Sequence, residues 1–190
     1  MILASASPRR SDLLDQIGLG FVVAPSDIDE SVRPGESAID YVRRLAIEKA
    51  VSADALLDDV VIAADTTVDV DGAILGKPDD EADARRMLKM LSGRAHRVHT
   101  GVAVRFGANI AADVGTTYVK LQPITDSLLT WYIGTGEPMG KAGAYAIQGE
   151  AAVLVDGVQG SITNVIGLPL AVLDRLMRSL GLSLAGLAAR

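Results

Sequence analysis

Short apolar runs along the chain predict β-strands. The continuous run VVIAA, at 60–64, is typical of a strand that is covered on both faces, and it ends at Asp65. The segment VDVDGAIL predicts a hairpin that turns at Asp71 and Gly72. The strands are expected within residues 2–4, 21–25, 60–64, 68–75, 97–121 and 151–160.

Apolar residues at helical spacing predict helices between these strands. The longest is expected from about Glu36 to Leu57, and either Asp79 or Asp80 is expected to cap the helix that follows the hairpin. The helices are expected over 7–17, 36–57, 79–91 and 126–133, and within 164–181. Because strands and helices alternate, the pattern predicts an α/β fold in which helices flank a mixed, twisted sheet, with residues 1–190 forming one domain.

The composition allows a sizeable core and narrows the class of partner. Of the 190 residues, 49% are hydrophobic, and the net charge of −6 argues against nucleic acid as the main partner, because phosphate backbones attract basic surfaces. A small anionic ligand would need only a few local cations. The chain contains no cysteine, which excludes disulfides and thiolate chemistry. With no signal peptide or membrane span expected, we predict a cytoplasmic protein.

The segment LASASPRR places two arginines at the start of a predicted helix. Ser7 is suited to the N-cap and Pro8 to the first helical position. The helix start would present backbone N–H groups beside the hydroxyls of Ser5 and Ser7 and two guanidinium groups, which is a suitable cradle for phosphate. The alternative from these residues alone is an ordinary capped helix with two solvated arginines.

Other candidate residues are less distinctive when each is taken singly. Asp65, directly after the buried strand, is expected at the edge of the sheet where ligands bind, and it could hold Mg²⁺ or deprotonate water. It could equally be a helix-cap or turn residue, while Asp69 and Asp71 are assigned to the hairpin and to solvent. Lys49 alone is most simply a surface lysine. His96 and His99 are expected on opposite faces of a strand and therefore as packed or solvated residues, not as partners on one metal.

Two further segments carry polar groups on constrained or glycine-rich backbone. Lys77 lies between Gly76 and Pro78. The segment GKAGAYAIQG, at 140–149, allows close approach of backbone to a ligand and carries Lys141 and Gln148.

In order along the chain, these segments resemble the Maf family of nucleoside triphosphate pyrophosphatases. The matching segments are LASASPRR, DIDE, RLAIEKA, AADTTV, GKP, MLKMLSGRAHRVHTGVAV, GEPMGKAGAYAIQG and NVIGLPL. The resemblance implies two lobes with a central cleft, an architecture related to inosine triphosphate pyrophosphatases. It also implies hydrolysis of nucleoside triphosphates to the monophosphate and pyrophosphate with a divalent cation, Mg or Mn, and assembly as a homodimer.

The resemblance also implies roles for individual residues. Asp65 matches the catalytic aspartate, and Glu30 matches an acidic residue near the reacting centre that would hold the metal together with Asp65. The positions associated with base specificity are Arg9, Thr66 and Gln148, and those lining the triphosphate site are Ser5, Arg10, Lys49 and Lys77. One departure is Ile162, where the family often has an aromatic residue. Which carboxylate would activate water stays open.

The amide of Gln148 favours a pyrimidine base. Uracil and thymine offer a carbonyl acceptor and an N–H donor, which a carboxamide can match, whereas the two donors of guanine suit a carboxylate better. This favours the branch of the family that acts on dTTP and UTP. Because an amide can rotate, activity on CTP or modified pyrimidine triphosphates is an open alternative. A 7-methyl-GTP or purine triphosphate pyrophosphatase, and a nucleotide-binding regulator of cell division, are the competing hypotheses.

Overall fold

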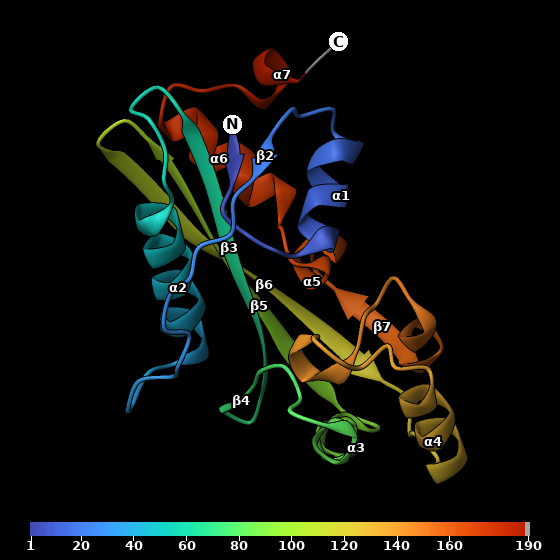
Figure 1. Cartoon of the computed structure of the whole chain (residues 1–190). Helices are drawn as coiled ribbons and strands as arrows, with labels where there is room; N and C mark the ends of the chain where they lie inside the picture. The colour runs from blue at the N-terminus through green and yellow to red at the C-terminus, as the bar shows by residue number, and fades with distance from the viewer. Residues whose placement is uncertain (189–190) are drawn as a thin grey trace.

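A computed structural model describes residues 1–188, which fold around a seven-stranded mixed sheet (Figure 1). The strand order is β2-β1-β3-β5-β6-β7, with β4 paired to β3. Strand β1 runs parallel to both β2 and β3, and the other pairings are antiparallel. The strands are β1 (Ile2–Leu3), β2 (Val22–Val23), β3 (Val60–Val70), β4 (Ala73–Leu75), β5 (Ala95–Phe106), β6 (Asn109–Leu121) and β7 (Val155–Gln159).

Helices cover both faces of the sheet. Helix α2 packs on β3 and β5 from one side, while α5 and α6 contact β5 and β6, and α1 lies against α5. The α-helices are α1 (Pro8–Gln16), α2 (Ala38–Ser52), α3 (Glu81–Leu91), α4 (Asp126–Gly134), α5 (Ile162–Ile166), α6 (Leu170–Ser179) and α7 (Leu184–Leu187). Two 3₁₀ turns, η1 (Ala142–Ala144) and η2 (Glu150–Leu154), lie in the segment after α4. The predicted α/β fold with a mixed sheet between helices is confirmed.

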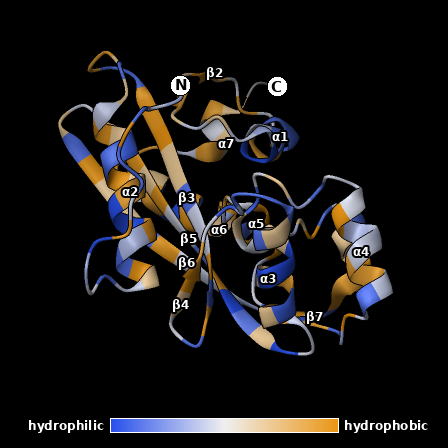
Figure 2. Cartoon of the chain, turned by 60° about the horizontal axis from the view of Figure 1, so that its bottom comes forward, coloured by the Kyte–Doolittle hydropathy of each residue, from blue (hydrophilic) through white to orange (hydrophobic). Residues whose placement is uncertain are grey.

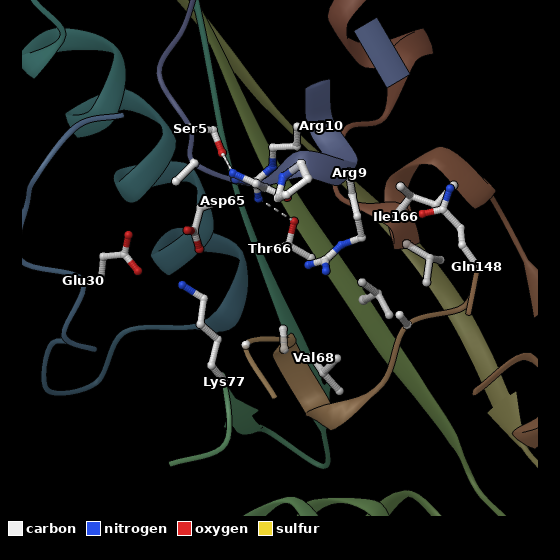
Figure 3. Close-up of a pocket in the computed structure, with 18 of the residues that line it drawn as sticks. Ser5, Arg9, Arg10, Glu30, Asp65, Thr66, Val68, Lys77, Gln148 and Ile166 are labelled. Carbon is white, nitrogen blue, oxygen red and sulfur yellow. Dashed lines mark hydrogen bonds between the residues drawn. The ribbon is translucent and has the colours of Figure 1, made fainter. Parts of the chain in front are cut away.

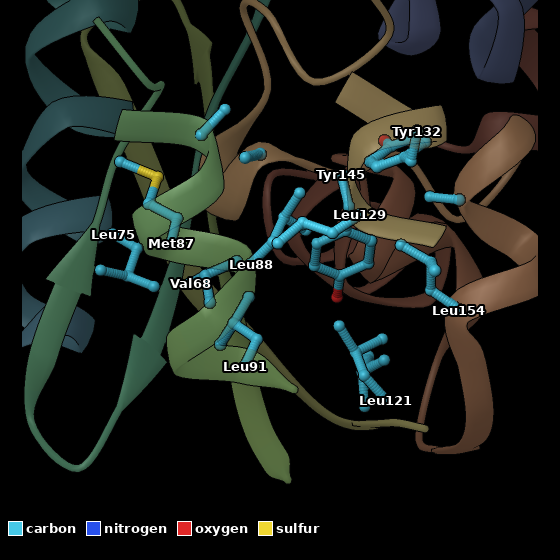
Figure 4. Packing of buried hydrophobic residues seen from close by; sticks show 14 of the residues in the cluster. Val68, Leu75, Met87, Leu88, Leu91, Leu121, Leu129, Tyr132, Tyr145 and Leu154 are labelled. Atoms are coloured by element: carbon cyan, nitrogen blue, oxygen red, sulfur yellow. The ribbon is translucent and has the colours of Figure 1, made fainter. Parts of the chain in front are cut away.

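The buried apolar side chains form three clusters. One lies under α2, a second joins α1 and α6 to the sheet, and the third packs around α3 and α4 at the opposite end of the long strands (Figure 4). Ile147 packs against both the second and the third cluster. Figure 2 shows hydrophobic residues along the first half of β3 and mixed faces on the helices that cover it. Residues of all three clusters line one pocket, among them Ala4, Val98 and Ile166.

Most predicted elements are present, but two of them have wrong boundaries. The expected long helix begins at Ala38, where the Ser37 side chain accepts a hydrogen bond from the Asp40 N–H, and it ends at Ser52. The strand expected to end before Asp65 continues to Val70, because β5 pairs with it along nearly its whole length. Asp65 therefore lies in the middle of a strand and not after its end.

Other local predictions are confirmed. Asp71 and Gly72 both have positive φ, at 52° and 83°, as the predicted two-residue hairpin turn requires. Asp80 caps α3 by accepting a hydrogen bond from the N–H of Asp83. Of the described residues, none belongs to a helix with the length and apolar content needed to cross a membrane.

A glycine allows α2 to approach the sheet closely. A Cβ atom on Gly101 would lie 2.2 Å from the backbone oxygen of Val42, which is much too close for any side chain. Gly101 pairs with Asp65 across β5 and β3. The close approach brings the face of α2 that carries Lys49 directly over Asp65.

Candidate active site

The candidate site lies at a gap along one edge of β3. On that edge β3 pairs with β1 as far as Ile62 and with β4 from Val68 onward. Asp65 and Thr66 lie in the gap, and a pocket of about 290 Å³ opens there. The ten residues that the sequence assigned to the site all line this one pocket: Ser5, Ser7, Arg9, Arg10, Glu30, Lys49, Asp65, Thr66, Lys77 and Gln148.

Strand alternation sends the two gap residues to opposite faces of the sheet. Asp65 faces α2 and meets Lys49, whereas Thr66 faces α1 and meets Arg10. A ligand that lies over the gap can therefore contact cations from both sides of the sheet.

Arg10 is a buried guanidinium held by three hydrogen bonds. Its Nε donates to the carbonyl oxygen of Gly167 at 2.8 Å, and its terminal nitrogens donate to Ser5 Oγ at 2.7 Å and Thr66 Oγ1 at 3.0 Å. Burial lowers the pKa of Arg10, and the nearby charge of Asp65 opposes that shift. Since a guanidinium has five N–H donors, the fixed group can still donate to an anion in the pocket.

Ser7 occupies the N-cap position of α1, with Pro8 as the first helical residue, but its hydroxyl makes no capping hydrogen bond. The prediction of a Ser7 side-chain cap is therefore wrong. Its backbone N–H donates instead to Ser5 Oγ at 3.3 Å, so that Ser5 Oγ accepts hydrogen bonds both from this N–H and from Arg10. The Ser7 hydroxyl lines the pocket.

Lys49 joins the two candidate carboxylates. Its Nζ lies 2.7 Å from Oδ1 of Asp65 and 2.7 Å from Oε1 of Glu30. The interpretation of Lys49 as a surface residue is wrong, because its side chain is only 8% exposed. Burial alone would raise the pKa of Glu30, but the hydrogen bond and charge of Lys49, with smaller contributions from Lys77 and Arg10, hold it below its usual value.

The opposite end of the pocket has a different character (Figure 3). Figure 3 shows Glu30, Asp65 and Lys77 at one end and Arg9, Gln148 and Ile166 at the other. Burial lowers the pKa of the half-buried Arg9, and the charge of Glu137 offsets part of that shift. The wall here is largely apolar and includes Val68, Val98, Tyr145, Ile147, Val165 and Ile166.

Sequence reasoning missed this apolar wall and one polar residue. Tyr41 lines a second hollow of about 230 Å³ beside Asp65, and its hydroxyl donates to the backbone oxygen of Glu30 at 2.9 Å. Its pKa is raised to about 12 by burial and by the charges of Asp65 and Glu30. The spacing of Tyr41, Leu45 and Lys49 on one helical face was the available signal.

Three residues that the sequence set aside also have clear positions. Asp69 is buried and not solvated, and its carboxylate contacts the Gly72 N–H and Arg97, which corrects that assignment. His96 and His99 are both buried, with hydrogen bonds to Tyr145 and Thr116, as expected for packed strand residues.

Ile162, the departure from the family pattern, is 47% exposed and lies outside the pocket lining. Among residues 1–188, no three His, Asp or Glu side chains converge on a point that could hold a metal ion.

The fold and the site together define an α/β protein with a pocket that is cationic at one end and apolar at the other. Residues 1–180 match the family described as Maf-like protein. The chain belongs to this Maf family.

Several curated relatives are similar over nearly their whole length. The dTTP/UTP pyrophosphatase of Anaeromyxobacter sp. (strain Fw109-5) is 50% identical over 95% of this chain and 89% of its own. Those of Methylobacillus flagellatus and Chromobacterium violaceum are 50% and 48% identical, over 97% and 96% of this chain and 94% and 95% of theirs. The solved structure of the Staphylococcus aureus Ham1 protein aligns with a TM-score of 0.44 and 19% identity over 63% of this chain and 70% of its own.

Proposed function

We propose that this enzyme hydrolyses dTTP and UTP to the nucleoside monophosphate and pyrophosphate. Relatives at about 50% identity are named dTTP/UTP pyrophosphatase. The observation that carries the proposal is the place of Asp65, a buried carboxylate that shares one pocket with the cations Arg10, Lys49 and Lys77 and with an apolar wall. A nucleotide laid along the pocket would bring its α-phosphate beside Asp65, its β- and γ-phosphates to the cations and its base to the apolar wall.

The cations would stabilise the charge on the departing pyrophosphate. Arg10 is held rigidly by three neutral oxygen atoms, so little of its positive charge is neutralised locally. Lys49 bridges Asp65 and Glu30, and the exposed Lys77 lines the same end. Fixed charges that already surround the phosphates need no reorganisation during the reaction.

Asp65 would accept a proton from the attacking water. The water oxygen bonds to the α-phosphorus, the bond to the bridging oxygen breaks, and pyrophosphate leaves with that electron pair. Lys49 and Gly101 hold Asp65 in place, the first through its ion pair and the second by admitting α2 close to the sheet. Glu30 is the other carboxylate within reach of Lys49 and the alternative proton acceptor.

The proposal includes a divalent cation, Mg or Mn, held by Asp65 and Glu30. Magnesium sites in nucleotide enzymes commonly use one or two carboxylates together with the substrate phosphates, and these two carboxylates meet at one atom, Lys49 Nζ. Lys49 takes one oxygen atom of each carboxylate, so the donor set fits once a triphosphate supplies further oxygen atoms. When bound, the cation would supply Lewis-acid charge at the phosphates.

Gln148 and Arg9 would recognise the base. The carboxamide of Gln148 has one donor and one acceptor group for the N–H and carbonyl of uracil or thymine. The small and apolar side chains around it, among them Val68 and Ile166, would cover the face of a pyrimidine.

The test is a panel of nucleoside triphosphates assayed for pyrophosphate release with Mg²⁺ or Mn²⁺. We expect dTTP and UTP to give the highest kcat/KM. A preference for 7-methyl-GTP or a purine triphosphate would contradict the assignment of the base. Nucleotide binding without pyrophosphate release would favour a regulatory role and contradict the enzymatic one.

A further inference from the structure

Behind the base end of the pocket, outside its lining, Glu137 makes three hydrogen bonds. Its Oε1 accepts from the Tyr132 hydroxyl at 2.9 Å and from the Ala151 N–H at 3.0 Å. Its Oε2 accepts from the Glu150 N–H at 2.8 Å. Two of the three donors are thus backbone groups that lie two and three residues beyond Gln148.

Gln148 lies between this contact and a tight turn. The Gly149 N–H donates to the carbonyl oxygen of Ala146 at 3.0 Å, which closes the turn that contains Gln148. The Gln148 side chain itself is exposed and has no hydrogen bond within the described part of the chain that would fix it. The position of its backbone is therefore set by the segments on either side.

We propose that Glu137 is a positioning residue for base recognition: its carboxylate clamps residues 149–151 so that Gln148 is presented to the pocket. This inference rests on the role of Gln148 in the proposed function. Glu137 does not contact the nucleotide in this arrangement and acts through the backbone.

The fit of Gly149 supports the clamp independently. A Cβ atom on Gly149 would lie 1.9 Å from Oε2 and 2.5 Å from Cδ of Glu137. The φ of Gly149 is −106°, which any residue can adopt. A side chain at this position would therefore displace the Glu137 carboxylate from its hydrogen bonds.

The charge of Glu137 also acts on Arg9, the second residue assigned to base recognition. It opposes the lowering of the Arg9 pKa by burial. Burial alone would raise the pKa of Glu137, but the N–H groups of Ala151 and Glu150 and the Tyr132 hydroxyl hold it below its usual value. An ionised carboxylate only accepts hydrogen bonds, which matches the three donors that surround it.

The test compares kcat/KM for dTTP and for GTP in matched variants. Glu137→Gln turns an N–H₂ group toward a backbone N–H. Gly149→Ala leaves the carboxylate in place chemically but adds a methyl group that pushes it away from the same backbone segment. We expect each to lower the dTTP-to-GTP ratio by about tenfold, mainly through a higher KM for dTTP, because a backbone donor of the clamp loses its acceptor. Glu150→Gln is the control, since it removes the same charge from an exposed side chain on the same segment and should change the ratio less than about twofold.

A milder variant and a second measurement keep the proposal testable if Glu137→Gln does not fold or is inactive. Tyr132→Phe removes one of the three hydrogen bonds and should shift the ratio in the same direction by less than Glu137→Gln. Amide hydrogen exchange at Glu150 and Ala151 should be faster in Glu137→Gln than in the parent, whether or not the protein is active.

The outcomes separate the clamp from the proposed function. If Gln148→Ala changes the ratio while Glu137→Gln and Gly149→Ala leave it unchanged, the clamp is overturned and base recognition by Gln148 stands. If Gln148→Ala also leaves the ratio unchanged, Gln148 does not recognise the base and the clamp has no functional consequence, which overturns it as well. Unchanged amide exchange in Glu137→Gln overturns the clamp even where the parent releases no pyrophosphate.

Discussion

The two ends of the pocket are built in different ways. At the phosphate end, the charged side chains of Arg10, Lys49 and Asp65, from α1, α2 and β3, are buried; Arg10 is held by hydroxyl and carbonyl oxygen atoms, and Lys49 pairs with carboxylates. At the base end, the polar groups are an exposed glutamine on a turn and the half-buried Arg9, and the surrounding residues are mostly apolar. The first end is part of the sheet and its core, whereas Gln148 at the second is carried by a segment between α4 and β7.

This difference indicates how the two tasks are separated. Binding a triphosphate requires fixed charge, and a buried ion pair stays in place because leaving either partner alone in the interior is costly. Choosing a base requires only a few directional groups, which a turn can present and which can change without disturbing the core. Substitutions at the phosphate end should therefore affect all nucleotides alike, and those at the base end should affect their ranking.

The largest expected effect is at Asp65. Asp65→Asn keeps the shape of the side chain but removes its charge, and loss of a general base typically costs about 10²- to 10⁴-fold in rate. Pyrophosphate release from dTTP and from GTP should fall by the same factor. Asp71→Asn, at an exposed position of the hairpin, is the control. Turnover within a few-fold of the parent in a folded Asp65→Asn protein would show that Asp65 is not catalytic.

Lys77 should distinguish triphosphates from monophosphates. Its side chain is exposed, so Lys77→Ala should leave the fold intact. Loss of a hydrogen bond to a charged group should weaken binding of dTTP by about tenfold or more and leave binding of dTMP nearly unchanged. Calorimetry in a buffer containing metal measures both affinities, with Lys89→Ala as a control at an exposed site on α3. Equal weakening for the two ligands would place Lys77 away from the β- and γ-phosphates.

Gln148 should change the ranking of bases without general damage. Gln148→Glu replaces the donor group by an acceptor that would face the C4 carbonyl of the pyrimidine. The ratio of kcat/KM for dTTP to that for GTP should fall by about tenfold, since an unmatched polar group costs about 1–3 kcal/mol. The ratio cancels any effect common to both nucleotides. A constant ratio would remove the physical support for pyrimidine selection by this residue.

The smallest expected effect concerns pH and the base end. Burial lowers the pKa of His96, which packs against Tyr145 in the pocket wall, to about 4. Because an unfolded histidine titrates near 6.5, the unfolded chain binds more protons between pH 6.5 and 4, and stability falls as the pH is lowered through that window. The free energy of unfolding should decrease by on the order of 1 kcal/mol or more.

His96→Gln keeps a hydrogen-bonding group for Tyr145 but cannot titrate. Denaturant unfolding at pH 7, 5.5 and 4.5 should therefore show a shallower decline for this variant than for the parent. Equal slopes would mean that His96 does not account for acid sensitivity in this half of the molecule.

Much of the local structure could be predicted from the sequence. The hairpin at Asp71 and Gly72 and the Asp80 cap follow from residue types whose effect is confined to a few neighbours. The continuity of β3 could not be predicted, because the polar residues 65–67 interrupt its apolar pattern and are held in the strand by pairing with β5. Lys49 was misjudged for a related reason: its burial depends on how closely α2 approaches the sheet at Gly101. The homodimer and the cytoplasmic location stay predictions.

By itself, the sequence determined the kinds of element, the caps and turns that bound them, and the set of polar residues available for a polyanion, because each of these depends on spacing or side-chain chemistry. Tertiary structure decided where those residues meet. β1 ends at Leu3 and β4 begins to pair at Val68, so a gap opens along β3, and strand alternation there sends Asp65 toward Lys49 and Thr66 toward Arg10. No spacing along the chain encodes that gap, because it arises from the relative lengths and order of strands that are far apart in the sequence.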